Sequence, residues 1–167
     1  MRPLWSAAAL MARVPAFLFR SRFRVHGDSM RPTLLHGDLL HIIPPCWTPA
    51  GYPRGSVVVV MSPAQDGAFW VKRVVGLPGE FVTIQGAGGV LIDDSPLPEP
   101  YLSHPYHPAE DTPPWLCDGD EYFLMGDNRS DSDDSRRYGP VSSHRIIGRV
   151  WLRWPLRRPA RSQEPIQ

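Results

Sequence analysis

The chain has 167 residues, which is enough for one domain with a small appendage. Its 20 prolines disfavour a helical bundle, because each proline in a helix interior costs about 3 kcal/mol, and its 42% hydrophobic content excludes global disorder. A formal net charge of +1 gives no attraction to nucleic acid, and two cysteines are too few for a disulfide-dense scaffold or a four-cysteine zinc site. We expect Cys46 and Cys117 to be unpaired thiols, because they lie far apart in the chain.

Residues 1–22 predict an N-terminal membrane-associated helix. The run from Pro3 to Phe19 is apolar apart from Ser6 and Arg13, and an arginine near mid-bilayer costs about 2.5–3.5 kcal/mol. The arginines fall on one narrow helical face and large apolar residues on the opposite one, as in a helix lying in the membrane interface. A spanning helix, an interfacial helix and an ordinary helix packed on the domain are the alternatives. The arginines that follow the apolar run favour a cytoplasmic main domain.

Residues 23–155 predict an all-β domain of antiparallel sheets with long loops. Short runs rich in β-branched and aromatic residues, bounded by glycine and proline, mark the strands. The glycines of 86–89 predict a hairpin and not a phosphate-binding loop, because no helix signal follows them. Residues 95–116 carry seven prolines and predict an irregular excursion, and the polar tail, 156–167, predicts disorder. The expected strands are 38–43, 55–61, 68–75, 80–85, 90–93, 121–125 and 145–152.

Lys72 is the first candidate for chemistry. It lies inside a strand-like run, where a lysine either points to solvent or is buried. Burial disfavours the charged form of an amine and lowers its pKa, and a neutral amine can act as general base toward a serine hydroxyl. A solvent-facing lysine on an edge strand is the ordinary alternative.

Ser29 is the second candidate. It follows Gly27 and Asp28 and precedes Met30 and Pro32, so its hydroxyl is presented at a bend whose backbone amides are suited to an oxyanion hole. Serines are common in turns, so this segment alone is weak evidence.

The third segment, residues 125–139, alternates acids, hydroxyls and guanidiniums. Ser132, Asp134 and Arg136 belong to it, and such a pattern suits a polar network that orients side chains from elsewhere in the fold. A Ser-His-Asp triad that uses His41 or His144 is an alternative, because triads are assembled in space and not in sequence.

Taken in order, the motifs Ser-Met-Arg-Pro-Thr (29–33), Lys-Arg-Val-Val-Gly-Leu-Pro-Gly-Glu (72–80) and Gly-Asp-Asn-Arg with Ser-Asp-Asp-Ser-Arg-Arg-Tyr-Gly (126–139) resemble the type I signal peptidase family. These are membrane-associated serine endopeptidases with a Ser-Lys dyad and an antiparallel β fold around a shallow cleft. The resemblance spans about residues 25–151. It implies that the chain removes signal peptides from exported preproteins, by a reaction that needs no metal or cofactor.

The resemblance implies a role for each matching residue. Ser29 matches the nucleophile, Lys72 the general base and Ser132 the serine that orients the lysine amine. Asp134 matches the acid that pairs with motif arginines, here Arg73 and Arg136. Gly27, Asp28, Met30 and Pro32 fall at the oxyanion and substrate-binding positions. The implied partners are an extended preprotein segment, with small residues before the cut, and membrane lipid; nucleic acid is not expected.

The sequence departs from the family pattern at a few positions. Gly27 stands where some members have an oxyanion-hole serine, and Glu80 stands where aspartate is frequent. Arg13 weakens the expected anchor, whereas the resemblance favours an extracytoplasmic main domain. These departures leave two further functions: a protease dedicated to one partner, similar to nickel superoxide dismutase maturation enzymes, and a catalytically inactive β-domain that binds peptides. Self-cleavage, as in repressors with the same dyad, is disfavoured because no DNA-binding domain precedes the motifs.

Overall fold

The computed structural model describes residues 22–48, 50–86, 89–104, 106 and 111–154. The helix expected over 1–22 lies outside these ranges except for Arg22, and so does the tail expected over 156–167. In the described part of the chain, no helix is long and apolar enough to cross a membrane.

The larger of two antiparallel sheets has the strand order β1-β2-β11-β3-β4-β9-β10. β3 lies at its middle, and its consecutive residues Val58, Val59 and Val60 are all buried. Both faces of β3 are therefore covered, which explains its unbroken run of valines, because a strand covered on both faces has no polar face. β1 forms one edge of this sheet and pairs only with β2 in the described residues. The bounds are β1 (Arg22–Arg24), β2 (Leu39–Ile43), β3 (Val57–Met61), β4 (Phe69–Gly76), β9 (Glu121–Met125), β10 (Val141–Ser142) and β11 (Ile146–Trp154).

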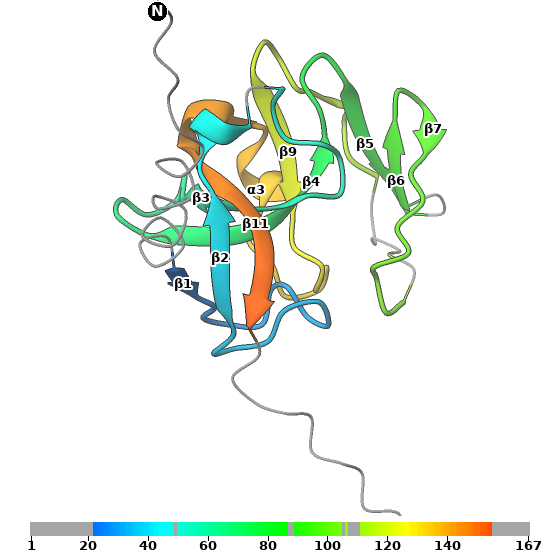
Figure 1. The fold of residues 1–167 in the computed structure, drawn as a ribbon. Coiled ribbons are helices and arrows are strands. Elements are labelled where there is room, and N and C mark those ends of the chain that lie inside the picture. The colour runs from blue at the N-terminus through cyan, green and yellow to red at the C-terminus, as the bar shows by residue number, and fades with distance from the viewer. Residues whose placement is uncertain (1–21, 49, 87–88, 105, 107–110, 155–167) are drawn as a thin grey trace, which may run out of the picture.

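A smaller sheet, of order β7-β6-β5-β8, stands to one side of the large one beyond β4 and β9 (Figure 1). Its central hairpin joins β5 to β6 with Gln85 opposite Gly89, where the glycine cluster predicted a hairpin. Helical structure in the described residues is limited to the short helix α3 and two 3-10 turns. The bounds are β5 (Phe81–Gln85), β6 (Gly89–Ile92), β7 (Ser95–Pro96), β8 (Trp115–Leu116), α3 (Ser135–Tyr138), η1 (Pro45–Trp47) and η2 (Ser143–Arg145).

Three apolar clusters hold this arrangement together. One lies on the large sheet around Val58, Val74 and Leu124, and a second joins β4 and β9 to the small sheet. The third packs Met30 and Leu34, from the loop between β1 and β2, against Val25 and Leu40. This third cluster fixes the loop that carries Ser29, because burying each large apolar side chain contributes about 1.5–3 kcal/mol.

The predicted all-β class of antiparallel sheets is confirmed, and each expected strand occurs with ends shifted by two residues or fewer. Two boundaries were wrong. Arg22 begins strand β1 and does not end a helix, because residues 22–24 pair with β2. The excursion 95–116 is not wholly irregular, since β7 and β8 form at its ends as edge strands, where proline is tolerated. Cys46 is exposed and Cys117 buried, and both are free thiols.

Candidate active site

The loop that carries Ser29 is tied down on both sides of that residue. The Arg31 N–H donates to the Asp28 carbonyl over 3.0 Å, and the Leu34 N–H donates to the Met30 carbonyl over 2.8 Å. The side chains of Met30 and Leu34 are buried beneath it. Ser29 therefore lies half-buried at the top of a turn whose underside is packed core.

Gly27 adopts a φ of +80°, a conformation that favours glycine, and nothing lies within 4 Å of the place where a Cβ would stand. Its N–H donates to Nδ1 of His36 over 3.2 Å. The missing side chain is thus explained by backbone conformation and not by crowding, and the Gly27 amide is already engaged within the loop.

Lys72 is a buried residue on β4, opposite Val58 of β3, with 4% of its surface exposed. Its Nζ donates to Oγ of Ser132 over 3.0 Å. Burial lowers the pKa of the Lys72 amine from 10.5 to about 8, and the charge of Arg136 lowers it further while Asp134 opposes the change. The solvent-facing alternative for Lys72 is therefore wrong.

Ser29 and Lys72 line one cavity of about 110 Å³. Met30, Val59 and Val71 contribute apolar walls to it. The cavity thus combines a serine hydroxyl, an amine with a lowered pKa and an apolar surface. Among the charged and polar lining residues, Arg24 and His26 come from β1 and the segment after it.

Gly126 lies between Ser29 and Ser132 and connects them. A Cβ built on Gly126 would stand 2.2 Å from Oγ of Ser132 and 2.5 Å from the Ser29 carbonyl, so only glycine allows this approach. Asn128 then closes the junction, because its N–H donates to the Ser29 carbonyl over 2.9 Å and its Nδ2 donates to the Asp28 carbonyl over 3.2 Å. The loop after β9 is therefore joined directly to the Ser29 turn.

Asp134 and Arg136 hold the other end of this loop. Asp134 caps α3 and accepts from the Gly126 N–H over 2.9 Å and from Nε of Arg136 over 2.8 Å. Burial alone would raise the pKa of Asp134, but the hydrogen bonds and charge of Arg136 outweigh it and lower the pKa. Arg136 also donates to the Ser132 carbonyl over 3.0 Å, which fixes the backbone that presents Oγ to Lys72.

The predicted pairing of Arg73 with Asp134 is wrong. Arg73 forms a two-pronged ion pair with the buried Asp127, with Nε–Oδ1 at 2.8 Å and Nη2–Oδ2 at 2.5 Å. The same guanidinium donates to the Gly55 carbonyl over 2.7 Å and to Oγ1 of Thr33 over 3.3 Å. Side chains alternate along a strand, so Arg73 and Lys72 face opposite ways: Arg73 contacts Asp127, whereas Lys72 contacts Ser132.

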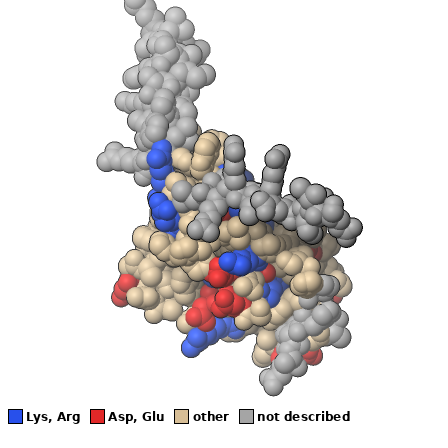
Figure 2. Space-filling view, turned by 90° about the horizontal axis from the view of Figure 1, so that it is seen from below, with Lys and Arg blue, Asp and Glu red and all other residues tan. Residues whose placement is uncertain are grey.

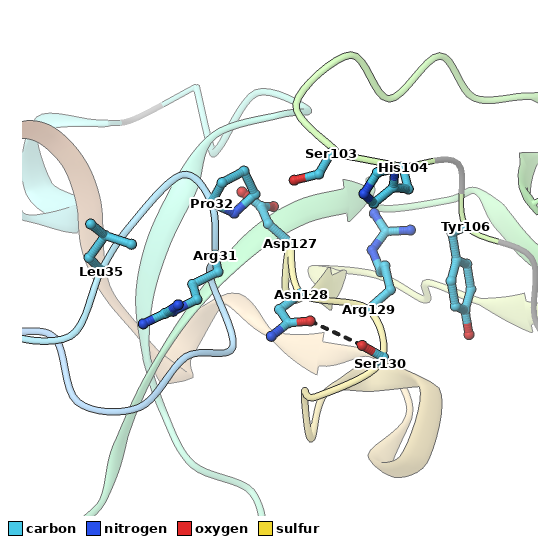
Figure 3. A pocket seen from close by; sticks show the side chains of 10 residues that line it. All are labelled: Arg31, Pro32, Leu35, Ser103, His104, Tyr106, Asp127, Asn128, Arg129 and Ser130. Carbon is cyan, nitrogen blue, oxygen red and sulfur yellow. Dashed lines mark hydrogen bonds between the residues drawn. The ribbon is translucent and has the colours of Figure 1, made fainter. Parts of the chain in front are cut away.

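A second, polar cavity of about 520 Å³ is lined by the end of the loop that carries Ser29 and by the loop after β9 (Figure 3). The turn contributes Arg31, Pro32 and Leu35, and the loop after β9 contributes Asp127 to Ser130. Ser130 donates to Oδ1 of Asn128 over 3.2 Å within this wall. The remaining lining residues are Ser103, His104 and Tyr106, from the excursion between the small-sheet strands.

The surface charges near this region are mixed in sign. Viewed from below, acidic and basic side chains lie side by side near the middle of the face (Figure 2). Exposed ion pairs show the same mixing, with Arg31 2.8 Å from Asp28 and Arg137 3.1 Å from Asp133. No strongly one-signed surface is seen on this face among the described residues.

The comparisons with known proteins decide the family. The model of the family described as "Signal peptidase, peptidase S26" matches residues 2–155. The chain belongs to the signal peptidase family. It is 34% identical to signal peptidase I of Leptolyngbya laminosa, covering 91% of this chain and 77% of that protein, and 31% identical to signal peptidase I P of Bacillus subtilis subsp. natto, covering 79% and 76%. A crystal structure of a signal peptidase I from Enterococcus faecalis V583 is 28% identical with a TM-score of 0.51, covering 60% of this chain and 97% of that one.

Membership of the signal peptidase family makes the chain a serine-type endopeptidase that removes signal peptides, and the family implies preproteins as its substrates. The three motifs that carried the resemblance meet at one place in the structure. They supply the Ser29 turn, the buried amine of Lys72 and the loop that holds Ser132.

The histidines of the alternative triad lie elsewhere in this signal peptidase fold. The side chain of His144 is 91% exposed, with Nε2 3.8 Å from Asp120, and His41 of β2 stands opposite Arg22 of β1. Neither lines the cavity of Ser29 and Lys72, whereas His26 does, with its ring edge-to-face against His36. His26 begins the segment that carries Ser29, but no motif in the sequence assigns it a role.

Other residues of the site also escaped sequence reasoning. Four further residues make hydrogen bonds or ring contacts behind Ser29 and Lys72: Asp127, Arg129, Glu99 and Tyr101. One signal was present but unused: Lys72 is the sole lysine of the chain, so every other member of its 18 lysine and arginine residues is arginine. A chain that uses arginine for all its other basic side chains has a specific need for an amine at position 72, because an amine loses its proton far more readily than a guanidinium.

Proposed function

We propose that Ser29 is the nucleophile and Lys72 the general base with which this signal peptidase cleaves preproteins. The observation that carries the proposal is the placement of Lys72: its amine is buried, has a pKa lowered to about 8, contacts Ser132 and shares a cavity with Ser29. A base must lose its proton near the working pH, and burial meets that need. Ser132, Asp134 and Arg136 are proposed to orient the amine.

The proposed reaction follows from these positions. Neutral Lys72 accepts the proton of the Ser29 hydroxyl as Oγ attacks the scissile carbonyl, and the negative charge moves to the carbonyl oxygen. The backbone N–H of Ser29 is proposed to donate to this oxygen; the Gly27 amide is already bonded to His36. Protonated Lys72 then gives its proton to the leaving amine as the peptide bond breaks. Water then attacks the acyl ester while Lys72 takes its proton, and protonated Lys72 returns that proton to Oγ of Ser29 as the ester bond breaks.

The two cavities suggest how a preprotein crosses the site. The apolar walls of Met30, Val59 and Val71 suit the small residues expected before the cut. We propose that the residues after the cut leave across the polar cavity, whose walls include Pro32 and the turn held by Asp28. The lining changes from one cavity to the other between Met30 and Arg31. The apolar cavity takes residues 23–26, 29 and 30 of this segment, and the polar cavity takes Arg31, Pro32 and Leu35.

We also propose that the chain works against a membrane. Phe69 is 52% exposed, and its ring lies 5.6 Å from that of Phe23. Phe23 belongs to β1, the edge strand that follows the predicted N-terminal helix. Exposed apolar side chains that lie together are typical of surfaces that contact a membrane or another protein. An extracytoplasmic position of the domain follows the family expectation, and a single dedicated partner is the alternative to a broad range of preproteins.

The test is cleavage of several preproteins by the full-length chain in detergent, with sequencing of the new N-termini. We expect cuts after small residues, and we expect none with Ser29→Ala or Lys72→Ala. Cleavage of one substrate alone would favour the dedicated protease. Full turnover by either variant would refute the dyad, and absence of any cleavage by the wild-type chain would favour an inactive peptide-binding domain.

A further inference from the structure

The excursion that follows the small sheet reaches back to the loop behind the dyad. Its Glu99 carboxylate accepts two hydrogen bonds from Arg129, one of them from Nη1 over 2.9 Å. Both side chains are almost fully buried, with 9% of Glu99 and 6% of Arg129 exposed. A buried pair of this kind holds its partners in a fixed geometry, because removing either one leaves an uncompensated charge.

Arg129 passes this constraint to Gly126. Its Nε donates to the Gly126 carbonyl over 3.0 Å, and its own carbonyl accepts from Nη1 of Arg136 over 2.6 Å. Gly126 is the residue packed between the Ser29 carbonyl and Oγ of Ser132. Glu99 is therefore two contacts away from the junction that sets both halves of the dyad.

Tyr101 applies a second constraint through Arg73. The guanidinium carbon of Arg73 lies 4.0 Å from the centre of the Tyr101 ring, while the Tyr101 hydroxyl donates to Glu99 over 2.6 Å. Burial and the Glu99 carboxylate raise the pKa of Tyr101, so the hydroxyl stays a donor. Arg73 in turn joins Asp127 to Thr33, which lies four residues after Ser29.

We propose that Glu99 and Tyr101 are positioning residues for the Ser29–Lys72 dyad, acting through Arg129 and Arg73 and not through the substrate. This inference rests on the proposed function. The competing role is a structural one, in which the same contacts only attach the excursion to the body of the fold. A loose loop would let Ser29 and Ser132 drift apart from Lys72, and a displacement of about 1 Å can cost on the order of 100-fold in rate.

The chain offers a matched control for the structural role. Glu80 also forms a partly buried ion pair, with Arg54 at 2.5 Å, and it also links the small sheet to the large one, since Arg54 donates to the Val75 carbonyl. In the described residues, the hydrogen bonds and ion pair of Glu80 go to Arg54, Leu77 and Cys117, and none goes to the loop of Ser132. Glu80→Gln therefore disturbs the attachment of the sheets to each other. It leaves intact the contacts through which Glu99 and Tyr101 are proposed to position the dyad.

The sole lysine allows a readout that does not depend on activity. In the full-length Ser29→Ala chain, labelled at lysine, NMR titration reports the pKa of Lys72 from a single side-chain signal. Tyr101→Leu removes the ring without changing charge, so we expect the loosened site to admit water and the Lys72 pKa to rise from about 8. Tyr101→Phe, which keeps the ring over Arg73, should titrate close to wild type, and Glu80→Gln should not change the titration.

Kinetics in the Ser29 chain complete the test. We expect Tyr101→Leu and Glu99→Gln to lower kcat by about 10-fold or more with KM within about two-fold, and we expect Tyr101→Phe to recover most of the rate. Unchanged kcat and an unchanged Lys72 titration in these variants would overturn the inference, as would a change confined to KM. If Glu99→Gln fails to fold, the Tyr101 pair decides. A shift in the Lys72 titration supports the positioning role of Glu99 and Tyr101 even if Ser29→Ala proves active. The positioning role and the assignment of Ser29 as nucleophile can therefore fail separately.

Discussion

Replacing Lys72 with methionine should abolish cleavage and yet stabilise the fold. The gap between the ordinary lysine pKa of 10.5 and about 8 corresponds to about 3 kcal/mol at pH 7, where the amine is protonated in both the folded and the unfolded chain. Methionine keeps an unbranched apolar stem and carries no charge to desolvate. Loss of the hydrogen bond to Ser132 costs about 1 kcal/mol, which leaves a net gain of about 2 kcal/mol.

The difference in stability between Lys72→Met and the wild-type chain should depend on pH. The folded pKa of Lys72 is the lower one, so below pH 8 the folded state bears the full cost of the buried charge. Between about pH 8 and 10.5 the folded chain releases the proton before the unfolded chain does, and the wild-type fold gains stability as pH rises. The advantage of Lys72→Met should therefore be largest at pH 7 and almost vanish at pH 10.

The assay is urea unfolding of the full chain in non-ionic detergent, monitored by tryptophan fluorescence. Arg73→Met is the matched control on the same strand, because it leaves the buried Asp127 without its partner and should destabilise by about 3–5 kcal/mol. Replacement by methionine should thus raise the free energy of unfolding at Lys72 and lower it at Arg73. A lower stability of Lys72→Met at pH 7, or a difference that does not change with pH, would refute the reasoning.

The remaining predictions concern the loop, the base, the histidine and the N-terminal segment. Gly126→Ala should reduce kcat by about 100-fold, because its Cβ collides with the Ser132 side chain and the Ser29 carbonyl; steady-state kinetics near wild type would show that the loop adapts. Lys72→Arg should be as inactive as Lys72→Ala, since a guanidinium keeps its proton, and measurable turnover would exclude the base assignment. His26→Ala should retain turnover in the same assay, and its loss would indicate a histidine base. Arg13→Leu should convert a chain partly extracted by alkaline carbonate into one that resists extraction, because it removes the main cost of insertion; a wild-type chain already resistant would support a spanning helix.

The strands could be predicted from sequence, and the segments that carry Ser29 and Lys72 could be singled out, because local patterns encode them. The valine run of β3 and the turn around Ser29 are signalled by neighbours in the chain, and the family motifs supplied the partners of Lys72. The short strands β7 and β8 were missed because their pairing depends on β5 and β6 and not on local propensity.

The ion pairs behind the dyad were beyond sequence reasoning for a different reason. The motif offers Asp127 and Asp134 as partners for Arg73 and Arg136. The alternation of side chains along β4 turns Arg73 toward Asp127, whereas Arg136 lies on α3 and pairs with Asp134, which caps that helix. Glu99 lies in a proline-rich stretch with no local motif, so its contact with Arg129 follows only from the folded path of the excursion. Long-range pairing of single side chains leaves no periodic trace in the sequence.

The most direct test of the account is to compare two titrations of Lys72. One is the NMR titration of the sole lysine in the full-length chain, and the other is the pH dependence of kcat/KM for a preprotein, which reports the base in the free enzyme. The account predicts that activity rises with pH along a limb near 8 and that the amine titrates at the same value. A lysine that titrates near 10.5, or an activity limb that does not coincide with the lysine titration, would contradict the assignment of Lys72 as the general base.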